Sequence, residues 1–324
     1  MDPTRIYCDV GKTDELLSSH IKENMIPMPK KNLQKFKLLP IIPNYTVKSS
    51  DNSEDHDKSI FSLMNPYPFI LRESYNLASI DYHFNILEYN SGILSPQLLR
   101  FQNFVICGAK DISSFEYIQY RNELTFMYNL GPSLDKEDLR DSFIIEDRIL
   151  NIFNNDYKDF NYYINRIKKI DSNGVDTFIS ESYNSDGELI YQLMIMLNVL
   201  KNGGDAIIKL KSIRINLTTD LLKMLSNCFN EVYLFKTFVS DINSDELYII
   251  GVNYNALNSI EVIKLIKLIM KKIKYDDNFF ELFSEKDPEV VNYIKRIMDL
   301  INKERDLEPS IYVPGKAKIY LNII

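Results

Sequence analysis

Apolar residues along this chain alternate between short continuous runs and longer runs with helical spacing. The continuous runs predict buried strands at 104–109, 123–130, 175–181, 205–210, 231–237 and 246–254. The helix-spaced runs predict helices at 114–121, 146–155, 160–170, 187–201, 218–230, 257–274 and near 288–303. Continuously apolar strands separated by helices are typical of a parallel sheet covered on both faces. The pattern therefore predicts an α/β fold.

The same pattern predicts how several elements begin and end. The Asn-Gly-Gly run at 202–204 follows the helix expected at 187–201, which predicts a glycine C-cap. Thr218 or Thr219 is expected to cap the next helix. Because the loop at 238–245 is too short to hold a crossover helix, the last two strands are expected to be antiparallel.

Composition along the chain predicts three parts. Residues 1–65 mix Pro, Lys, Ser and Asp and are expected to form an N-terminal extension that is partly flexible. The α/β pattern occupies 66–256, and 257–324 is expected to be a helical C-terminal extension. The end of the chain, 309–324, is expected to be a strand. The chain shows no internal repeat.

Charge limits the classes of partner. The chain has 324 residues, of which 45% are hydrophobic and 26% are charged, and its formal net charge is −7. An acidic chain is a poor candidate for gripping nucleic acid over its whole surface, although a local basic groove remains compatible with it. Lysine-rich segments occur at 30–37 and 264–274, and a solvated face is the favoured interpretation of both.

Cysteine and histidine give no sign of a metal site or a disulfide framework. These residues are Cys8, Cys107, Cys228, His20, His56 and His83. Their scattered positions fit no ligand spacing, so we expect no metal and an intracellular, reducing setting. No apolar run reaches about 18 residues and no signal peptide opens the chain, so we expect a soluble, cytoplasmic protein with no membrane partner.

A lysine and a glutamate are predicted at neighbouring strand ends. Lys209 lies near the end of the strand that follows the Gly-Gly pair, and Glu246 opens the last strand in the run Ser-Asp-Glu-Leu-Tyr at 244–248. Such a pair suits removal of a proton from a sugar hydroxyl. The structural alternative for Lys209 is an ordinary lysine at a strand terminus.

These motifs resemble the FtsJ/RrmJ-type RNA ribose 2′-O-methyltransferases over about residues 70–255. The resemblance implies a Rossmann-like methyltransferase fold, in which a mostly parallel sheet ends in an antiparallel hairpin. It also implies S-adenosylmethionine (SAM) as cofactor if the chain is active, and no cofactor otherwise. The family carries a Lys-Asp-Lys-Glu tetrad whose second lysine deprotonates the ribose hydroxyl. Lys209 matches that second lysine and Glu246 matches the glutamate.

The chain departs from the other two tetrad positions. The family's aspartate corresponds to Glu181 in the run Phe-Ile-Ser-Glu at 178–181, which is longer by one methylene. The first lysine corresponds to Asn76, in the run Tyr-Asn-Leu-Ala-Ser-Ile-Asp at 75–81. Since Asn76 carries no charge, the resemblance implies that one catalytic cation is missing.

The positions implied to bind the cofactor are also altered. The family's glycine-rich loop after the first strand corresponds here to 108–115, where Gly108 is the one glycine and Ala109 and Ser113 stand nearby. Glycines in such a loop let the backbone approach the cofactor and leave the helix N-terminus open. The acidic residue that usually holds the cofactor ribose corresponds to Asn129. These changes predict a weak or absent SAM site.

Within the family, the chain resembles viral cap-methylating proteins of large cytoplasmic DNA viruses. The poxvirus mRNA-capping enzyme small subunit, which is similar to a methyltransferase that has lost catalysis, stimulates a catalytic partner. Three interpretations follow. The first is a non-catalytic regulatory subunit whose partner is a capping-enzyme catalytic subunit, in the cytoplasm, at a viral factory or in a virion. The second is an active cap ribose 2′-O-methyltransferase that acts on capped mRNA. The third is an α/β domain with a structural role.

Overall fold

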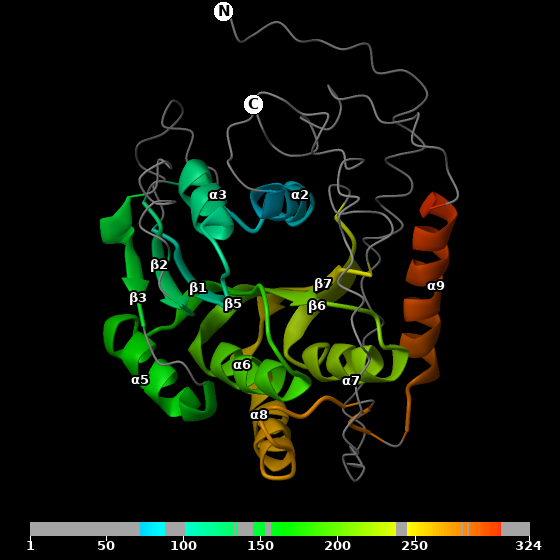
Figure 1. The fold of residues 1–324 in the computed structure, drawn as a ribbon. Helices are drawn as coiled ribbons and strands as arrows, with labels where there is room; N and C mark the ends of the chain where they lie inside the picture. Colours follow the sequence, from blue (N-terminus) through cyan, green and yellow to red (C-terminus); the bar gives the residue numbers. More distant parts are fainter. Residues whose placement is uncertain are drawn as a thin grey trace, which may run out of the picture.

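The computed structural model describes residues 72–87, 101–122, 124–132, 134, 145–152, 157–237, 245–279, 281–283 and 285–305 (Figure 1). The N-terminal extension expected at 1–65 and the strand expected at 309–324 lie outside the described residues.

The described residues form a seven-stranded sheet with the order β3-β2-β1-β4-β5-β7-β6. The strands are β1 (Asn103–Cys107), β2 (Phe126–Leu130), β3 (Ile149–Asn151), β4 (Val175–Ser180), β5 (Leu200–Leu210), β6 (Phe229–Phe235) and β7 (Leu247–Tyr254). The first five strands run parallel, whereas β7 is antiparallel to both of its neighbours, β5 and β6. A mostly parallel sheet that ends in an antiparallel hairpin is the Rossmann-like methyltransferase fold, so the fold class predicted from the sequence is confirmed.

Helices cover both faces of this sheet (Figure 1). The helices are α2 (Arg72–Phe84), α3 (Ser113–Arg121), α5 (Phe160–Ile170), α6 (Asp186–Val199), α7 (Ile215–Leu225), α8 (Ala256–Met270) and α9 (Pro288–Arg305). Helices α2 and α3 lie on one face and build one apolar cluster with it, while α5 to α9 build a second cluster on the other face. Because both faces are covered, all six residues of β4 are buried, including the polar residues Asp176, Thr177 and Ser180.

The segment that follows α8 packs across the start of α6. The backbone N–H of Gly187 donates to the carbonyl of Asp277 at 2.9 Å, and the N–H of Phe279 donates to the Asp186 carboxylate at 2.7 Å. Arg214 forms an ion pair with the same carboxylate. Since α8 and α9 also contribute to the large apolar cluster, this C-terminal region shares one core with the sheet.

The helix predicted at 146–155 is wrong. Residues Glu146–Arg148 form a single 3₁₀ turn (η4), and the next three residues form β3, which pairs with β2 in the register Met127↔Ile149. The β-branched Ile149 fits the pleated edge of the sheet, and pairing with β2 overrides the helical spacing of the apolar residues.

Two predicted helix boundaries are also wrong. Helix α6 ends at Val199 because Leu200 is already extended and pairs with Val175, so residues 202–204 lie inside β5. Helix α7 begins three residues earlier than expected, with Arg214 at its N-cap. Thr219, one of the two expected caps, lies inside that helix, where its hydroxyl donates to the carbonyl of Ile215 at 2.6 Å.

A buried polar cluster fixes α2 to α3. The Asp81 carboxylate accepts hydrogen bonds from the Leu87 N–H at 2.7 Å, the Tyr117 hydroxyl at 2.8 Å and the Arg121 Nε at 2.9 Å. Burial raises the pKa of Asp81, and these donors oppose that effect. The ion pair mainly positions α2. It adds little net stability, because the cost of removing two charges from water offsets most of their attraction.

We expect Asp81→Ala to lower the free energy of unfolding by about 3–5 kcal/mol, because it leaves the buried Arg121 guanidinium uncompensated. Urea unfolding followed by circular dichroism measures the change. The double variant Asp81→Ala/Arg121→Met should recover a large part of the loss. Equal losses in the single and double variants would contradict this account. The exposed pair of Lys264 and Glu261 is the control, and Glu261→Ala should cost less than about 0.5 kcal/mol.

Candidate functional site

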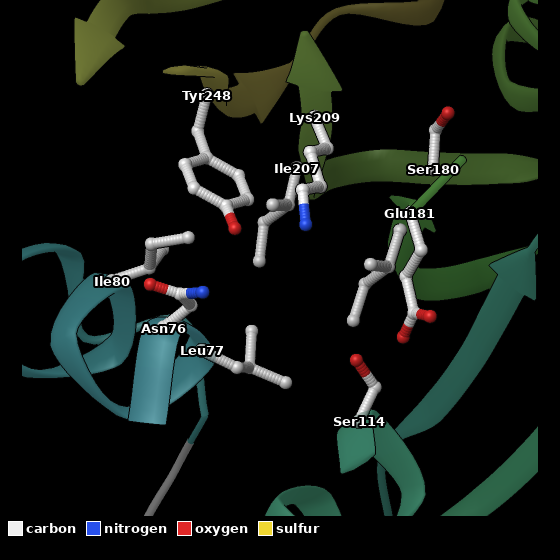
Figure 2. Close-up of a pocket in the computed structure, with 10 residues that line it drawn as sticks. Asn76, Leu77, Ile80, Ser114, Ser180, Glu181, Ile207, Lys209 and Tyr248 are labelled. Atoms are coloured by element: carbon white, nitrogen blue, oxygen red, sulfur yellow. The ribbon is translucent and has the colours of Figure 1, made fainter. Parts of the chain in front are cut away.

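A pocket opens at the carboxyl edge of the sheet, between the sheet and helix α2 (Figure 2). It is a shallow pocket with about 310 Å³ of empty space, part of which is open solvent. Its lining residues are Asn76, Leu77, Ile80, Ser114, Ile179, Ser180, Glu181, Ile207, Lys209 and Tyr248. Aliphatic side chains from α2, β4 and β5 form its walls, and polar groups gather where the strands end. A ligand with an apolar body and polar substituents suits such a lining.

The Lys209–Glu246 pair forms as the sequence predicts. Lys209 lies opposite Tyr248 in the antiparallel pairing of β5 with β7, so its diagonal neighbour on the same face is Glu246. Lys209 Nζ lies 3.1 Å from Glu246 Oε2, and the Tyr248 hydroxyl donates to Glu246 Oε1 at 3.0 Å. Lys236 Nζ donates to the backbone oxygen of Glu246 at 3.3 Å. This glutamate is therefore held by groups from three strand ends.

The other two tetrad positions lie in the same pocket. Glu181 directly follows β4, its N–H donates to the carbonyl of Cys107 at 2.9 Å, and its carboxylate points toward Ser114 (Figure 2). Asn76 enters from α2, and its Oδ1 accepts a hydrogen bond from the Thr237 hydroxyl. Four positions that are far apart in the sequence thus meet at one edge of the sheet. Their catalytic roles remain predictions.

Sequence reasoning did not single out two residues that hold this site. Tyr248 lies within the Ser-Asp-Glu-Leu-Tyr run, and its position two residues after Glu246 in a strand was the available signal, since such residues share a face. Thr237 follows β6 and reaches Asn76, which is 161 residues away in the chain. No local pattern predicts a contact over that separation.

The resemblance implies that a cofactor would bind at the ends of β1 and β4, next to the pocket. Strand order reverses between β1 and β4, and ligands of doubly wound sheets bind in the crevice at the carboxyl ends of such a strand pair. Gly108 follows β1 with φ of 69°, and its carbonyl accepts a hydrogen bond from the Ser182 hydroxyl at 2.6 Å. A Cβ on Gly108 would overlap the backbone oxygen of Ser182. The chain itself therefore bridges the two strand ends.

Tyr157, in the 3₁₀ turn η5 (Tyr157–Asp159), fills the neighbouring position between β1 and β2. Its hydroxyl accepts a hydrogen bond from the Gly108 N–H at 3.0 Å and donates to the carbonyl of Leu130. Burial raises the pKa of Tyr157, so the hydroxyl keeps its proton and remains a donor. The backbone N–H that a glycine loop would offer to a ligand is thus occupied by a side chain. Tyr157 carries no sequence signal for this role.

The remaining predicted cofactor positions are also engaged within the chain. Ala109 is buried, and the Ser113 hydroxyl donates to the Asp111 carboxylate. Asn129 Nδ2 donates to Asn151 Oδ1 at 2.8 Å and to the carbonyl of Pro132 at 2.9 Å. Asn129 Oδ1 is buried and has no hydrogen-bond partner among the described residues. An amide that is tied to the next strand is poorly placed to hold a ribose.

The described residues contain no group of three or more His, Cys, Asp or Glu side chains that could hold a metal ion. Cys107 and Cys228 are buried, and burial raises the pKa of both thiols, to about 12 for Cys228. Thiols in this state are unreactive at neutral pH. In the part of the chain that the structure describes, no helix is long and apolar enough to cross a membrane.

No family model and no curated protein matches this sequence. Among solved structures, the chain is similar to a putative hemolysin from Lactococcus lactis, with 11% identity, a TM-score of 0.41, and coverage of 74% of this chain and 99% of that one. It is similar to human methyltransferase-like protein 13 in complex with SAH, with 12% identity, a TM-score of 0.39, and coverage of 76% and 99%. It is also similar to a fibrillarin pre-rRNA processing protein from Methanococcus jannaschii, with 15% identity, a TM-score of 0.37, and coverage of 56% and 75%. At these scores the likenesses carry no functional argument, and the fold assignment rests on the strand order.

We expect Gly108→Ala to destabilise the chain much more than Gly203→Ala. Both glycines have positive φ, at 69° and 83°, so each substitution carries a backbone cost of about 1 kcal/mol. A Cβ at Gly203 meets only Asn253 Oδ1 at 3.7 Å, whereas one at Gly108 overlaps the Ser182 backbone. Chemical denaturation should show a further loss of about 2 kcal/mol or more for Gly108→Ala. Equal losses would mean that the strand ends are not in contact.

Proposed function

We propose that this chain is a methyltransferase-fold protein that does not use SAM. It acts as a non-catalytic subunit of an mRNA-capping machinery, and it binds and stimulates a capping or cap-methylating partner. The proposal places it in the cytoplasm, at a viral factory or in a virion. The capping assignment rests on the sequence resemblance, and the loss of catalysis rests on the geometry of the cofactor side.

The observation that supports the proposal is the pair of hydrogen bonds that Ser182 and Tyr157 make to the backbone of Gly108, at the ends of β1 and β4. Cofactors of this fold class need an open crevice at the switch point and free backbone N–H groups in the loop that follows. Here Ser182 bonds to the Gly108 carbonyl, and the Tyr157 hydroxyl occupies the Gly108 N–H. A ligand would have to break both contacts, and burying any group left unpaired would cost about 1–3 kcal/mol.

The tetrad positions add a second argument. Lys209, whose Nζ lies 3.1 Å from Glu246 Oε2, would act as a general base only as a free amine. The resemblance implies a neighbouring lysine that would favour the free amine, and Asn76 stands in its place. Without that positive charge, the free amine of Lys209 is less favoured, and proton removal from a ribose hydroxyl is less efficient.

The alternative function is an active mRNA cap ribose 2′-O-methyltransferase with Lys209 as base. The observation that favours it is the meeting of Asn76, Glu181 and Lys209 in one pocket, with Glu246 paired to the lysine. These are the positions that the resemblance implies for the catalytic tetrad, and Glu181 and Lys209 both line the pocket. Capped mRNA would then be the substrate and SAM the cofactor.

Calorimetric titration of the purified chain with SAM and with S-adenosylhomocysteine tests the main proposal. We expect no saturable binding, with a Kd weaker than about 1 mM, because Ser182 and Tyr157 occupy the backbone groups of Gly108. An active ribose methyltransferase titrated in parallel is the positive control. Micromolar binding of either ligand would overturn the proposal. Addition of the chain to a capping-enzyme catalytic subunit from the same genome should raise its methylation rate, and a mixture with no complex would remove the capping assignment.

Substitution of Lys209 tests the alternative. If Lys209 is the base, Lys209→Met should lower methyl transfer to capped RNA by about 10²–10⁴-fold while the chain stays folded. Lys211→Met is the matched control, because Lys211 Nζ lies 5.0 Å above the Tyr183 ring and outside the pocket lining. Equal residual activity in the two variants would exclude Lys209 as base. No activity in the unmodified chain would favour the non-catalytic subunit.

A further inference from the structure

Helix α8 buries one face and leaves a second face open. Its buried residues pack toward α6 and the large apolar cluster, and they are Ser259, Val262, Leu265, Ile266 and Ile269. Figure 1 shows α8 as an outermost element, beyond α6 on the side away from α2. On its other face Leu257 is 80% exposed, Ile260 is 47% exposed and Leu268 is 50% exposed.

These exposed aliphatic side chains form a stripe. Leu257 and Ile260 are three residues apart, and Ile260, Lys264 and Leu268 follow at intervals of four, which places all of them on one side of the helix. Lys264 lies between Ile260 and Leu268 on this side of the helix, and the alkyl stem of a lysine can cover apolar surface. Single exposed aliphatic residues need no explanation, but a continuous stripe of them marks a contact surface.

The charge around the stripe is opposite to that of the chain. Five lysines and one glutamate lie between residues 257 and 274, in a chain whose net charge is −7. The single acid, Glu261, pairs with Lys264 at 2.7 Å. The lysines that remain along the stripe include the exposed Lys267 and Lys271. A partner that covers this face must bury aliphatic groups and supply negative charge.

We infer that the open face of α8 is a docking surface for an amphipathic helix of another protein, with aliphatic residues on one side and acidic residues flanking them. A helix laid along residues 257–268 would match the stripe over about 16 Å, since each residue adds about 1.5 Å. Two copies of this chain would bring lysines against lysines, which disfavours self-association through this face. The inference goes beyond the proposed function, because the surface is separate from the pocket and from the contacts around Gly108.

A designed peptide probe tests this docking surface on the full chain. The probe is a labelled helix with leucine along one face and glutamate flanking it, and the comparison peptide carries lysine in place of glutamate. Fluorescence anisotropy should show saturable binding of the acidic peptide only. Leu257→Ser/Leu268→Ser should weaken it by about tenfold or more. The matched control is Tyr162→Ser/Ile170→Ser on α5, whose side chains are 41% and 52% exposed, and it should leave binding unchanged.

Charge reversal separates the electrostatic part of the surface. Lys264→Glu/Lys267→Glu should weaken binding of the acidic peptide and strengthen binding of the basic peptide. Added salt should weaken binding of the acidic peptide to the unmodified chain, because the lysine charges are exposed. Failure of the acidic peptide to saturate, or equal binding to the α5 and α8 variants, would overturn the inference. A dimer that Leu257→Ser dissolves, or preferential binding to anionic lipid vesicles, would also overturn it, because the occupant would then be a second copy or a membrane. None of these outcomes depends on SAM, so they leave the proposed function untouched.

Discussion

Burial of the sheet on both faces is the constraint on which the rest of this structure depends. Strands such as β4 have no solvent-facing side, so a side chain of the sheet can reach a ligand mainly from a strand end. The carboxyl ends of the parallel strands meet at one edge. Lys209, Glu181 and the residues that hold Glu246 therefore converge there, although they come from distant parts of the sequence. The location of the site follows from the fold, and its chemistry follows from which residues occupy that edge.

Two parts of this edge have different character. Around β5 and β7, Lys209, Glu181 and Tyr248 line a pocket that is partly open to solvent, and Glu246 pairs with the lysine. Around β1 and β2, the Tyr157 hydroxyl and the Ser182 hydroxyl satisfy the groups of Gly108 that an open loop would present. A methyl transfer needs both parts at once, one for the acceptor and one for the donor. The proposed loss of SAM binding rests on the second part, where both polar groups of Gly108 have partners within the chain.

The sequence predicted the strands of the buried sheet well, because their continuous apolar character is a local signal. Its main failure in type was 146–155, where a short edge strand was taken for a helix, since the helical spacing was local and the pairing with β2 was not. The convergence of Lys209 and Glu246 was foreseeable from strand ends alone. The position of Tyr157 could not be predicted. Its contact with Gly108 joins residues 49 apart, and it depends on a 3₁₀ turn that has no recognisable sequence pattern. Local patterns thus predicted the strands and most of the helices, whereas the contacts around Gly108 depend on tertiary structure.

The strand order has a consequence for the sequence of events during synthesis. β7 lies between β5 and β6 in the sheet, yet it is made after both of them. While the ribosome is still translating the loop before residue 247, β6 has no partner next to it, and the edge of β5 is open. Since proteins emerge at about 5–20 residues per second, these two edges stay uncovered for a time that is long compared with hairpin formation. The antiparallel end of the sheet is therefore completed only after β7 has been made, and the Lys209–Glu246 pair forms no earlier than that.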